Sequence, residues 1–512
     1  MPWISTLSIS PTMSEFTPSE VLQLYNGLDT ALTLEIFQKL QQTHNTFPEV
    51  YSFSRALQAP VLEMMLRGWK IDLEKRDEVV EELRARLLRL ENILNIFADA
   101  VWSKPLNANS PKQLIDFFYR TMKLPEQWIS KKGESRLSTD REALEKLLDY
   151  FDAKPIINTI LAIRDLKKQL SVLTTEIDFD NRFRSSFNIA GTETARFSSS
   201  SSAWGTGSNI QNISPSLRFV FSADWGKKIV GIDLEQAESR EVGWLCGILF
   251  NDWSYLDACY AGDLHTLTCR LIWSDLPWTG DLKKDRAIAD NPFYREYSYR
   301  DMSKRGGHGS NYFGTPLTMA RHLKVPTKIM EHFQEKYFSA FPGIPKYHKH
   351  VAKELQTVQR ITTPWGRTRT FFGRPNDPST LREAIAFSPQ SSTADRMNLG
   401  LYRLWEHFGK RIQLLAQVHD AVYFQIDEND NENEIITKAL EIIDIPLFHG
   451  TRKLIVPGEA KSGWNWGNWC CGLRNNGICS TSQKPCALRA NPNGLKKFKN
   501  QDLRKRDISS IF

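Results

Sequence analysis

The chain of 512 residues is longer than one hydrophobic core usually serves, so two or more lobes are expected. Its composition, 41% hydrophobic and 24% charged, is that of an ordinary globular enzyme and excludes a low-complexity chain. The net charge of +7 is compatible with a polyanionic partner but does not require one.

The N-terminal segment predicts a cytoplasmic protein that opens with a helix. "MPWISTLSIS" lacks the basic start and the long apolar core of a signal peptide. No apolar run approaches the ~20 residues of a bilayer span. Residues 14–45 carry apolar side chains at three- and four-residue intervals, with a helix cap at Thr17 before Pro18.

Residues 55–125 predict long amphipathic helices. Residues 106–125 form a loop and then a helix that starts at Ser110 and Pro111 and ends at Pro125. Within 55–100, one apolar stripe runs amid charged residues. The stripe comprises Val79, Val80, Leu83, Leu87, Leu90 and Leu94.

Residues 190–216 are rich in Gly, Ser and Thr and have few apolar side chains. A flexible linker is the simplest interpretation of such a stretch. Long or planar hydrogen-bonding side chains are unusual in a tether, however, and favour a binding role. They are Arg196, Trp204, Gln211 and Asn212.

The second half of the chain mixes strands and helices. "KKIVGIDLEQAESREVGWLCGILF" (227–250) predicts a strand that runs into a helix, with Asp233 at the end of the strand. Helices and loops follow to about residue 345. The closing part predicts β-strands together with two helices, 378–408 and 432–444, before a basic, irregular tail.

The seven cysteines are scattered and odd in number, which argues against a disulfide framework and for a reducing compartment. Four of them, Cys470, Cys471, Cys479 and Cys486, lie near the C-terminus. Their spacing matches no common zinc pattern, and no histidine lies nearby to complete a site. We therefore do not predict a zinc site there.

A polar pair, His419 and Asp420, interrupts two apolar strand patterns in "AQVHDAVYFQI". Because Asp is common in tight turns, a hairpin turn is sufficient to explain the pair. If this hairpin lies beside the strand that carries Asp233, however, both carboxylates point at one spot, where a cation would offset their repulsion. Oxygen ligands of this kind suit Mg²⁺, and two such ions about 4 Å apart serve polymerases and nucleases.

The stretch "YRDMSKRGGHGSNYFG" places four functional side chains on one helix face, because they recur every fourth residue. They are Arg300, Lys304, His308 and Tyr312. A solvated charged stripe is the plain alternative. The tyrosine and the interposed glycine pair favour instead a helix that offers charge to a triphosphate and flat rings to a base.

These motifs resemble the family A DNA polymerases, the DNA polymerase I group, and their bacteriophage members in particular. The four-residue spacing is similar to the fingers helix, "DLEQAESR" (233–240) to the first palm motif, and "VHD" (418–420) to the last. "ETARFSSS", "NIQNI", "GDLHTLT", "TTPWGRTR" and "REAIAFSPQSSTAD" resemble further family segments. The resemblance covers roughly residues 55–465.

The resemblance implies an α+β right-handed polymerase fold with an antiparallel palm sheet that carries both aspartates. The implied domains are a remnant of the C-terminal part of a 3′–5′ exonuclease-like domain (1–54), thumb (55–180), first part of the palm (181–260), fingers (261–344), second part of the palm (345–465) and a basic C-terminal tail (466–512).

The exonuclease resemblance is confined to "YNGLDTALTLEIF", with Tyr25 and Asp29 in the family's positions. The earlier carboxylates of that domain have no room before residue 25. Either the chain lost most of the domain, or a separate exonuclease chain supplies it. The plain alternative is that residues 14–45 form only a packing helix.

The resemblance also implies roles at the catalytic centre. Asp233 and Asp420 would hold two Mg²⁺ ions, while Arg300, Lys304 and His265 would contact the dNTP. Lys304 would also serve as general acid for pyrophosphate departure. Glu238 would act as a steric gate against a ribose 2′-OH.

Other residues would contact the nucleotide or the primer–template DNA. Tyr312 and His308 would lie at the nascent base pair, with Gln236 beside it. The implied DNA contacts, mostly in the minor groove, are Arg196, Gln211, Asn212, Arg240, Arg382, Gln390 and His419.

Three positions depart from the family pattern. Ala421 replaces the usual acidic residue after the last aspartate, His308 replaces Phe or Tyr, and Ala386 replaces an Asn of the minor groove. We expect activity to persist, with altered discrimination against dideoxynucleotides through His308.

The main functional expectation is a DNA-directed DNA polymerase that takes primer–template DNA and dNTPs in phage DNA replication, with a processivity factor as a possible further partner. A single-subunit RNA polymerase is the nearest alternative, and Glu238 argues against it. A defunct polymerase that survives as a DNA-binding protein is the other.

Overall fold

The computed structural model describes residues 17–43, 48–131, 134–295, 297–470, 474–475, 478–479 and 490–498. The chain divides into two compact units, 1–56 and 57–512. The first unit consists of α1 (Pro18–Thr43) and α2 (Pro48–Ala56). As predicted, Thr17 caps α1: its hydroxyl accepts from the Glu20 backbone N–H, and the Glu20 carboxylate accepts from Thr17 N at 2.9 Å.

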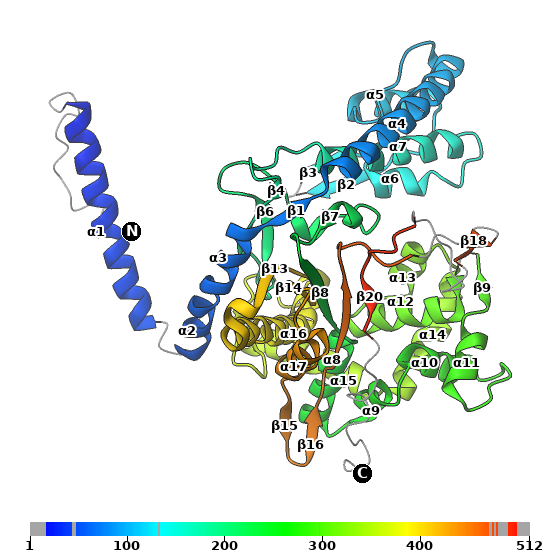
Figure 1. Cartoon of the computed structure of the whole chain (residues 1–512). Helices are drawn as coiled ribbons and strands as arrows, with labels where there is room; N and C mark the ends of the chain where they lie inside the picture. Colours follow the sequence, from blue (N-terminus) through cyan, green and yellow to red (C-terminus); the bar gives the residue numbers. More distant parts are fainter. Residues whose placement is uncertain are drawn as a thin grey trace, which may run out of the picture. The chain divides into compact units, whose positions relative to one another are not determined.

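The centre of the second unit is an antiparallel five-stranded sheet in the order β13-β14-β8-β17-β20 (Figure 1). The strands are β8 (Lys227–Leu234), β13 (Ile412–Val418), β14 (Ala421–Asp427), β17 (Gly458–Gly463) and β20 (Lys496–Lys497). The predicted antiparallel sheet is therefore confirmed. Asp233 lies on β8, and Asp420 lies in the turn between β13 and β14.

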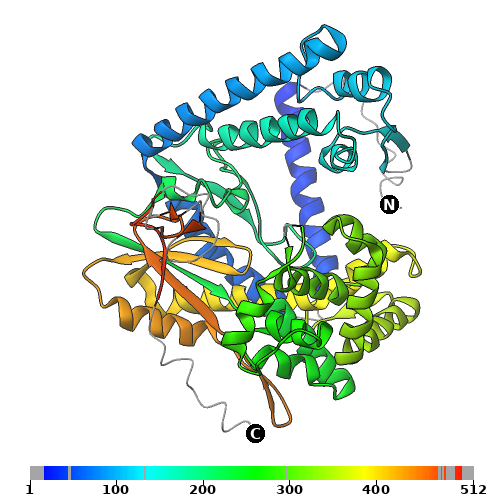
Figure 2. The ribbon, with the colours of Figure 1, turned by 90° about the vertical axis from the view of Figure 1, so that its right-hand side faces the viewer.

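Helices α16 (Pro378–Phe408) and α17 (Glu432–Ile443) contact the strands of this sheet (Figure 2). α8 (Ala237–Phe250) and α15 (Gly343–Thr357) pack against α16 and against each other. The predicted helix bounds 378–408 and 432–444 agree with α16 and α17 to within one residue. Val230, Ile232 and Phe424 are fully buried on one face, and Ile229, which projects from the other face, is fully buried as well, so the centre of β8 is covered on both sides.

Aromatic rings pack on the opposite face of the sheet. Trp69 stacks on Trp466 at 4.9 Å between ring centroids and meets Tyr423 edge-on at 6.1 Å. A side chain at Gly231 would place its Cβ 2.6 Å from the Tyr423 ring, so the ring occupies the space that the glycine leaves. This packing fixes the strand register next to Asp233.

A helical lobe follows β1 (Trp69–Ile71), a short strand that interrupts the helices predicted over 55–100. Its helices are α4 (Leu73–Trp102), α5 (Pro111–Ile115), a π-helical segment (Asp116–Thr121), α6 (Arg141–Lys146) and α7 (Lys154–Leu173). The lobe also contains a strand pair, β2 (Trp128–Lys131) with β3 (Glu134–Leu137). α4 packs along α7 (Figures 1 and 2). As predicted, Ser110 caps α5, but the helix ends before Pro125.

A second helical lobe surrounds its own core of residues such as Met302, Phe333 and Tyr337. Its elements are α9 (Ser254–Tyr260), α10 (Leu264–Ile272), α11 (Leu282–Ala289), β9 (Pro292–Tyr294), β10 (Tyr297–Ser298), α12 (Tyr299–Asn311), α13 (Pro316–Leu323) and α14 (Thr327–Ala340). The residues between β8 and β13 thus include a helical lobe with its own hydrophobic core.

Short elements complete the second unit. They are β4 (Arg182–Phe183), β5 (Ser185–Asn188), β6 (Ser198–Ser201), β7 (Phe221–Ser222), β11 (Arg360–Thr362), β12 (Thr368–Thr370), β15 (Leu447–His449), β16 (Arg452–Leu454), β18 (Arg474–Asn475), β19 (Ile478–Cys479) and three 3₁₀ turns (Ile210–Asn212, Arg218–Val220, Gly409–Arg411). Because β6 pairs with β5 and a 3₁₀ turn follows, residues 190–216 are not a plain linker.

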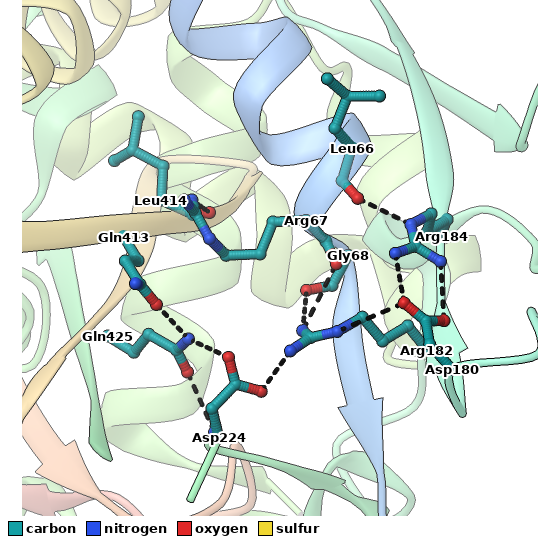
Figure 3. A network of polar contacts seen from close by, with 10 residues as sticks. All are labelled: Leu66, Arg67, Gly68, Asp180, Arg182, Arg184, Asp224, Gln413, Leu414 and Gln425. Atoms are coloured by element: carbon teal, nitrogen blue, oxygen red, sulfur yellow. Dashed lines mark hydrogen bonds and ion pairs between the residues drawn. The ribbon is translucent and has the colours of Figure 1, made fainter. Parts of the chain in front are cut away.

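Two arginines join the α4–α7 lobe to the sheet (Figure 3). α3 (Gln58–Arg67) ends just before β1, and its last carbonyls lack helical partners. Arg184 donates to the Leu66 carbonyl at 2.7 Å, and Arg182 contacts Asp224 at 2.6 Å. Asp224 in turn accepts from Gln425 of β14 at 2.6 Å. A continuous polar network therefore fixes the joint of the lobe against the strand that follows Asp420.

Among the helices that the structure describes, none combines the length and the apolar character that a bilayer span requires. Cys470 is buried. Cys471 and Cys486 lie outside the described residues, so the prediction about zinc stays a prediction.

Candidate active site

Two aspartates meet at one end of the central sheet. Asp233 on β8 lies directly opposite Ala421, the first residue of β14. The Leu234 backbone N–H donates to the Asp420 carbonyl at 3.1 Å. Two residues, His419 and Asp420, form the whole turn between β13 and β14, and His419 has a positive φ of 55°. The hairpin-turn interpretation of this pair is thus correct, and the same turn sets Asp420 beside Asp233.

Burial and like charge act together on these carboxylates. Burial and, after it, the neighbouring Asp420 charge together raise the pKa of Asp233 to about 6, against the opposing effect of Lys461. Burial also raises the pKa of Asp420, while the Arg196 guanidinium lowers it. A divalent cation would relieve this repulsion, so the pair fits an oxygen-ligated metal site.

The donor set is small. Within the described ranges, no group of three or more His, Cys, Asp or Glu side chains is arranged to hold a metal ion. Two carboxylates are nevertheless what Mg²⁺ takes when substrate phosphates and waters supply its remaining ligands. The residues present therefore fit Mg²⁺ as an ion shared with a phosphorylated substrate.

Glu238 is held from two sides. It lies in the first turn of α8, where the helix dipole favours a carboxylate. Arg196 donates to one of its oxygens and the Tyr312 hydroxyl to the other. The same Arg196 guanidinium lies 3.7 Å from an Asp420 oxygen. Segments far apart in sequence are thus linked through Glu238 to the aspartate pair.

The predicted helix is present as α12, with Tyr312 at its C-cap. A capping box of Ser298 and Asp301 starts the helix, and Lys304 and His308 are exposed. The His308 ring lies 4.9 Å from the Tyr312 ring. The interposed glycines serve packing, because a Cβ at Gly306 would lie 2.7 Å from the Phe333 ring.

Arg300 is already paired. Asp263 accepts from its Nε at 2.9 Å and from its Nη2 at 3.0 Å. Asp263 also caps α10, where it accepts from the backbone N–H of His265 at 3.2 Å. Burial, with the Arg300 charge, lowers the pKa of His265 to about 4, so its imidazole is neutral at pH 7.

Other predicted residues lie at different depths. Asn212, Arg382 and His419 are exposed, whereas Gln390 on α16 is half-buried. Gln211 donates to the Gln417 carbonyl at 3.3 Å.

Gln236 has a left-handed backbone at the start of α8. Its Oε1 is buried without a hydrogen-bond partner, and its amide nitrogen donates to the Gly262 carbonyl at 3.5 Å. Within the protein, the Gln236 side chain therefore uses its amide nitrogen and leaves its carbonyl oxygen without a partner.

Arg240 is placed differently from its prediction. It is 7% exposed and donates to the carbonyls of Glu235, Ile455 and Cys259 at 3.0 to 3.4 Å. Its guanidinium also lies over the Tyr260 ring. These bonds hold α8 against its neighbours, so this geometry does not support the predicted contact with DNA.

Three charged residues near the site were not singled out from the sequence. Asp263 stands in the quoted "GDLHTLT", and its position one residue before a helix is a capping signal that could have found it. Glu459 and Lys461 lie on β17, and Glu459 is directly opposite Asp233. Only the strand register reveals that proximity.

Comparisons with known proteins show what this chain is similar to. A family model described as DNA polymerase family A matches residues 74–468. The DNA polymerase I of Helicobacter pylori strain J99 is 28% identical over 423 residues, which cover 78% of this chain and 42% of that protein. The thermostable DNA polymerase I of Thermus aquaticus is 26% identical over 88% of this chain and 53% of its own length.

A solved structure shares the fold. The POL domain of Pol1 from M. smegmatis, in complex with DNA primer-template and dNTP, matches with a TM-score of 0.63 and 22% identity. The match covers 80% of this chain and 69% of that one. The chain spans about half the length of the curated relatives that it matches.

Proposed function

Because this chain belongs to DNA polymerase family A, we propose that it extends a primer 3′-OH with dNTPs as directed by a DNA template. The observation that carries the proposal is the meeting of Asp233 on β8 with Asp420 in the turn that precedes the neighbouring strand β14. The two residues are 187 positions apart in numbering, 420 minus 233. An enzyme of this class needs two carboxylates at one spot to accept cations together with substrate phosphates.

Asp233 and Asp420 would hold two Mg²⁺ ions, which when bound would neutralise phosphate charge and favour ionisation of the primer hydroxyl. Lys304, exposed on α12, would contact the triphosphate and protonate the departing pyrophosphate. Arg300, oriented by Asp263, would face the outer phosphates. His265, neutral at pH 7, would add a hydrogen bond. Positioning and charge neutralisation would supply most of the rate.

Glu238 would exclude a ribose 2′-OH and so favour dNTPs over rNTPs. Its fixed position supports this role, because Arg196 and Tyr312 hold both carboxylate oxygens. His308 and Tyr312 would stack at the nascent base pair. This gate is the feature that favours a DNA polymerase over a single-subunit RNA polymerase.

The DNA-binding residues in the proposal are those with accessible polar groups, together with Gln236 beside the nucleotide. They are Arg196, Gln211, Asn212, Arg382, Gln390 and His419. Contacts to minor-groove acceptors, which every correct pair presents, would test base-pair geometry without reading sequence. Arg240 would instead hold α8 in place through its hydrogen bonds to backbone carbonyls.

The proposed domains are the thumb, palm and fingers with the boundaries given above, the thumb corresponding to the α4–α7 lobe and the fingers to the lobe around α12. We propose a role in phage DNA replication in the host cytoplasm. Tyr25 and Asp29 are exposed on α1, and the proposal includes no proofreading by this chain alone. Either the exonuclease-like domain has been mostly lost, or a separate exonuclease chain supplies that activity. A processivity factor is a further possible partner within this proposal.

Extension of a labelled primer with four dNTPs and Mg²⁺ tests the proposal. We expect wild type to extend the primer and Asp420→Asn to lose extension, because one of two ligand carboxylates is gone. Asp427→Asn is the matched control, since Asp427 lies at the far end of β14, the strand that follows Asp420, and its side chain is 48% exposed. Retained DNA binding without any extension by wild type would favour the defunct relic instead. Equal use of rNTPs and dNTPs would favour the RNA polymerase.

A further inference from the structure

A strand from the C-terminal segment completes the catalytic sheet. The family match ends at residue 468, yet β20 adds a fifth strand beside β17 (Figure 1, red). Its segment is held by backbone bonds from Leu495 N to the Gly467 carbonyl at 2.7 Å and from Phe498 N to the Ala460 carbonyl at 3.0 Å. The segment 490–498 is thus built into the sheet.

Side-chain and glycine packing hold the same segment. Asn491 and Asn465 exchange two amide hydrogen bonds at 2.9 Å each. A Cβ at Gly463 would lie 2.5 Å from the Gly494 carbonyl oxygen, and a Cβ at Gly494 would lie 2.6 Å from the Asn468 carbonyl. Two backbones therefore approach here as closely as only glycine permits.

The register brings the lysines of this edge next to Asp233. In one row across the sheet, Asp233 lies between Ala421 and Glu459. In the next row, Lys461 lies opposite Lys497. Directly opposed residues of antiparallel strands project from the same face, so these charged side chains all share the face of the aspartate pair.

An ion pair crosses between the two rows. Lys497 Nζ lies 2.8 Å from Glu459 Oε2. The Lys497 side chain is 53% exposed, so the pair contributes little to folding. After burial and the Asp420 charge, which raise the pKa of Asp233, Lys461 lowers it and Glu459 raises it.

We propose that Lys497 is a positioning residue that holds and neutralises Glu459, keeping this third carboxylate away from the metal ions shared by Asp233 and Asp420. The inference rests on the proposed function. Without the lysine, Glu459 would add a negative charge beside the ions. Divalent cations would then bind more tightly, and the triphosphate would be repelled.

Lys497→Met, Glu459→Gln and the double variant test this role. Mn²⁺ affinity is measured by electron paramagnetic resonance without substrate, and KM for dNTP and kcat are measured by primer extension. For Lys497→Met we expect Mn²⁺ to bind about threefold more tightly and KM to rise about threefold, the size of a partly screened single-charge interaction. The double variant should return both values to near wild type, because the carboxylate is gone.

Two controls separate this role from a structural one. Lys496→Met lies on the same strand but on the other face, with its ammonium 5.0 Å from the Trp469 ring centroid, and should leave Mn²⁺ affinity unchanged. Lys497→Arg should behave as wild type. An unchanged Mn²⁺ affinity in Lys497→Met, or a double variant as altered as the single one, would overturn the proposal. Wild type that binds Mn²⁺ but extends no primer would instead refute the proposed function.

Discussion

Asp263→Asn is the substitution whose effect the structure defines most closely. The carboxylate of Asp263 accepts two hydrogen bonds from Arg300 and also caps α10. Asn caps helices as well as Asp does, so the start of α10 should survive the change. The charge and the second acceptor oxygen are lost, and with them the bidentate pair that ties α10 to α12.

The magnitude follows from the acid strength of Asp263. Burial opposes its ionisation, but the Arg300 partner outweighs burial and lowers the pKa to about 2 from an ordinary 3.8. The side chain is 17% exposed. Because a tenfold change in acid strength corresponds to about 1.4 kcal/mol, ionised Asp263 contributes about 2 kcal/mol to the free energy of unfolding.

The sign of this contribution is set by the lowered pKa. The contribution is complete above pH 4 and is lost as the pH falls from about 4 to about 2. Urea unfolding at pH 7 and at pH 5 should therefore show the same deficit, about 2 kcal/mol, for Asp263→Asn.

Asp281→Asn is the matched control, because Asp281 caps α11 through the Lys283 N–H. It should change the free energy of unfolding by less than about 0.5 kcal/mol. A deficit in this control as large as that of Asp263→Asn would show that capping, not the arginine, is responsible. An Asp263→Asn variant whose free energy of unfolding equals that of wild type would refute the reasoning altogether.

Three further predictions concern selectivity, the core and pH. Glu238→Ala should reduce the ratio of dNTP to rNTP incorporation by at least about tenfold, measured as relative kcat/KM. An unchanged ratio would contradict the proposed role of Glu238 as a steric gate. Arg396→Met should cost about 3–5 kcal/mol in urea unfolding, because its fully buried partner Glu241 is left unpaired; replacing Glu241 by Leu as well should recover most of it. The pKa of His265 is about 4, so wild-type stability should fall as the pH drops from about 6.5 to 4, since the unfolded chain protonates first. His265→Gln should flatten this dependence, and an equally steep curve would contradict the assignment.

The sequence by itself determined many local elements and the family to which the chain belongs. Thr17 marks the start of α1 through capping, and the bounds 378–408 predicted from the sequence match those of α16. Asp420 could be placed in a turn because two apolar strand patterns flank it. Such signals lie within a few residues of each other, so they need no knowledge of the rest of the fold.

Tertiary structure alone decided which charged groups meet. "DLEQAESR" contains both Glu238, which joins the site, and Arg240, which is buried among carbonyls, and nothing in the local pattern separates them. Glu459 lies opposite Asp233 only because β17 pairs with β8 in one register. Lys497 lies beside Glu459 only because a later segment adds β20 to the sheet. Long-range pairing is set by the packing of the whole sheet, and a one-residue slip would send these side chains to the other face.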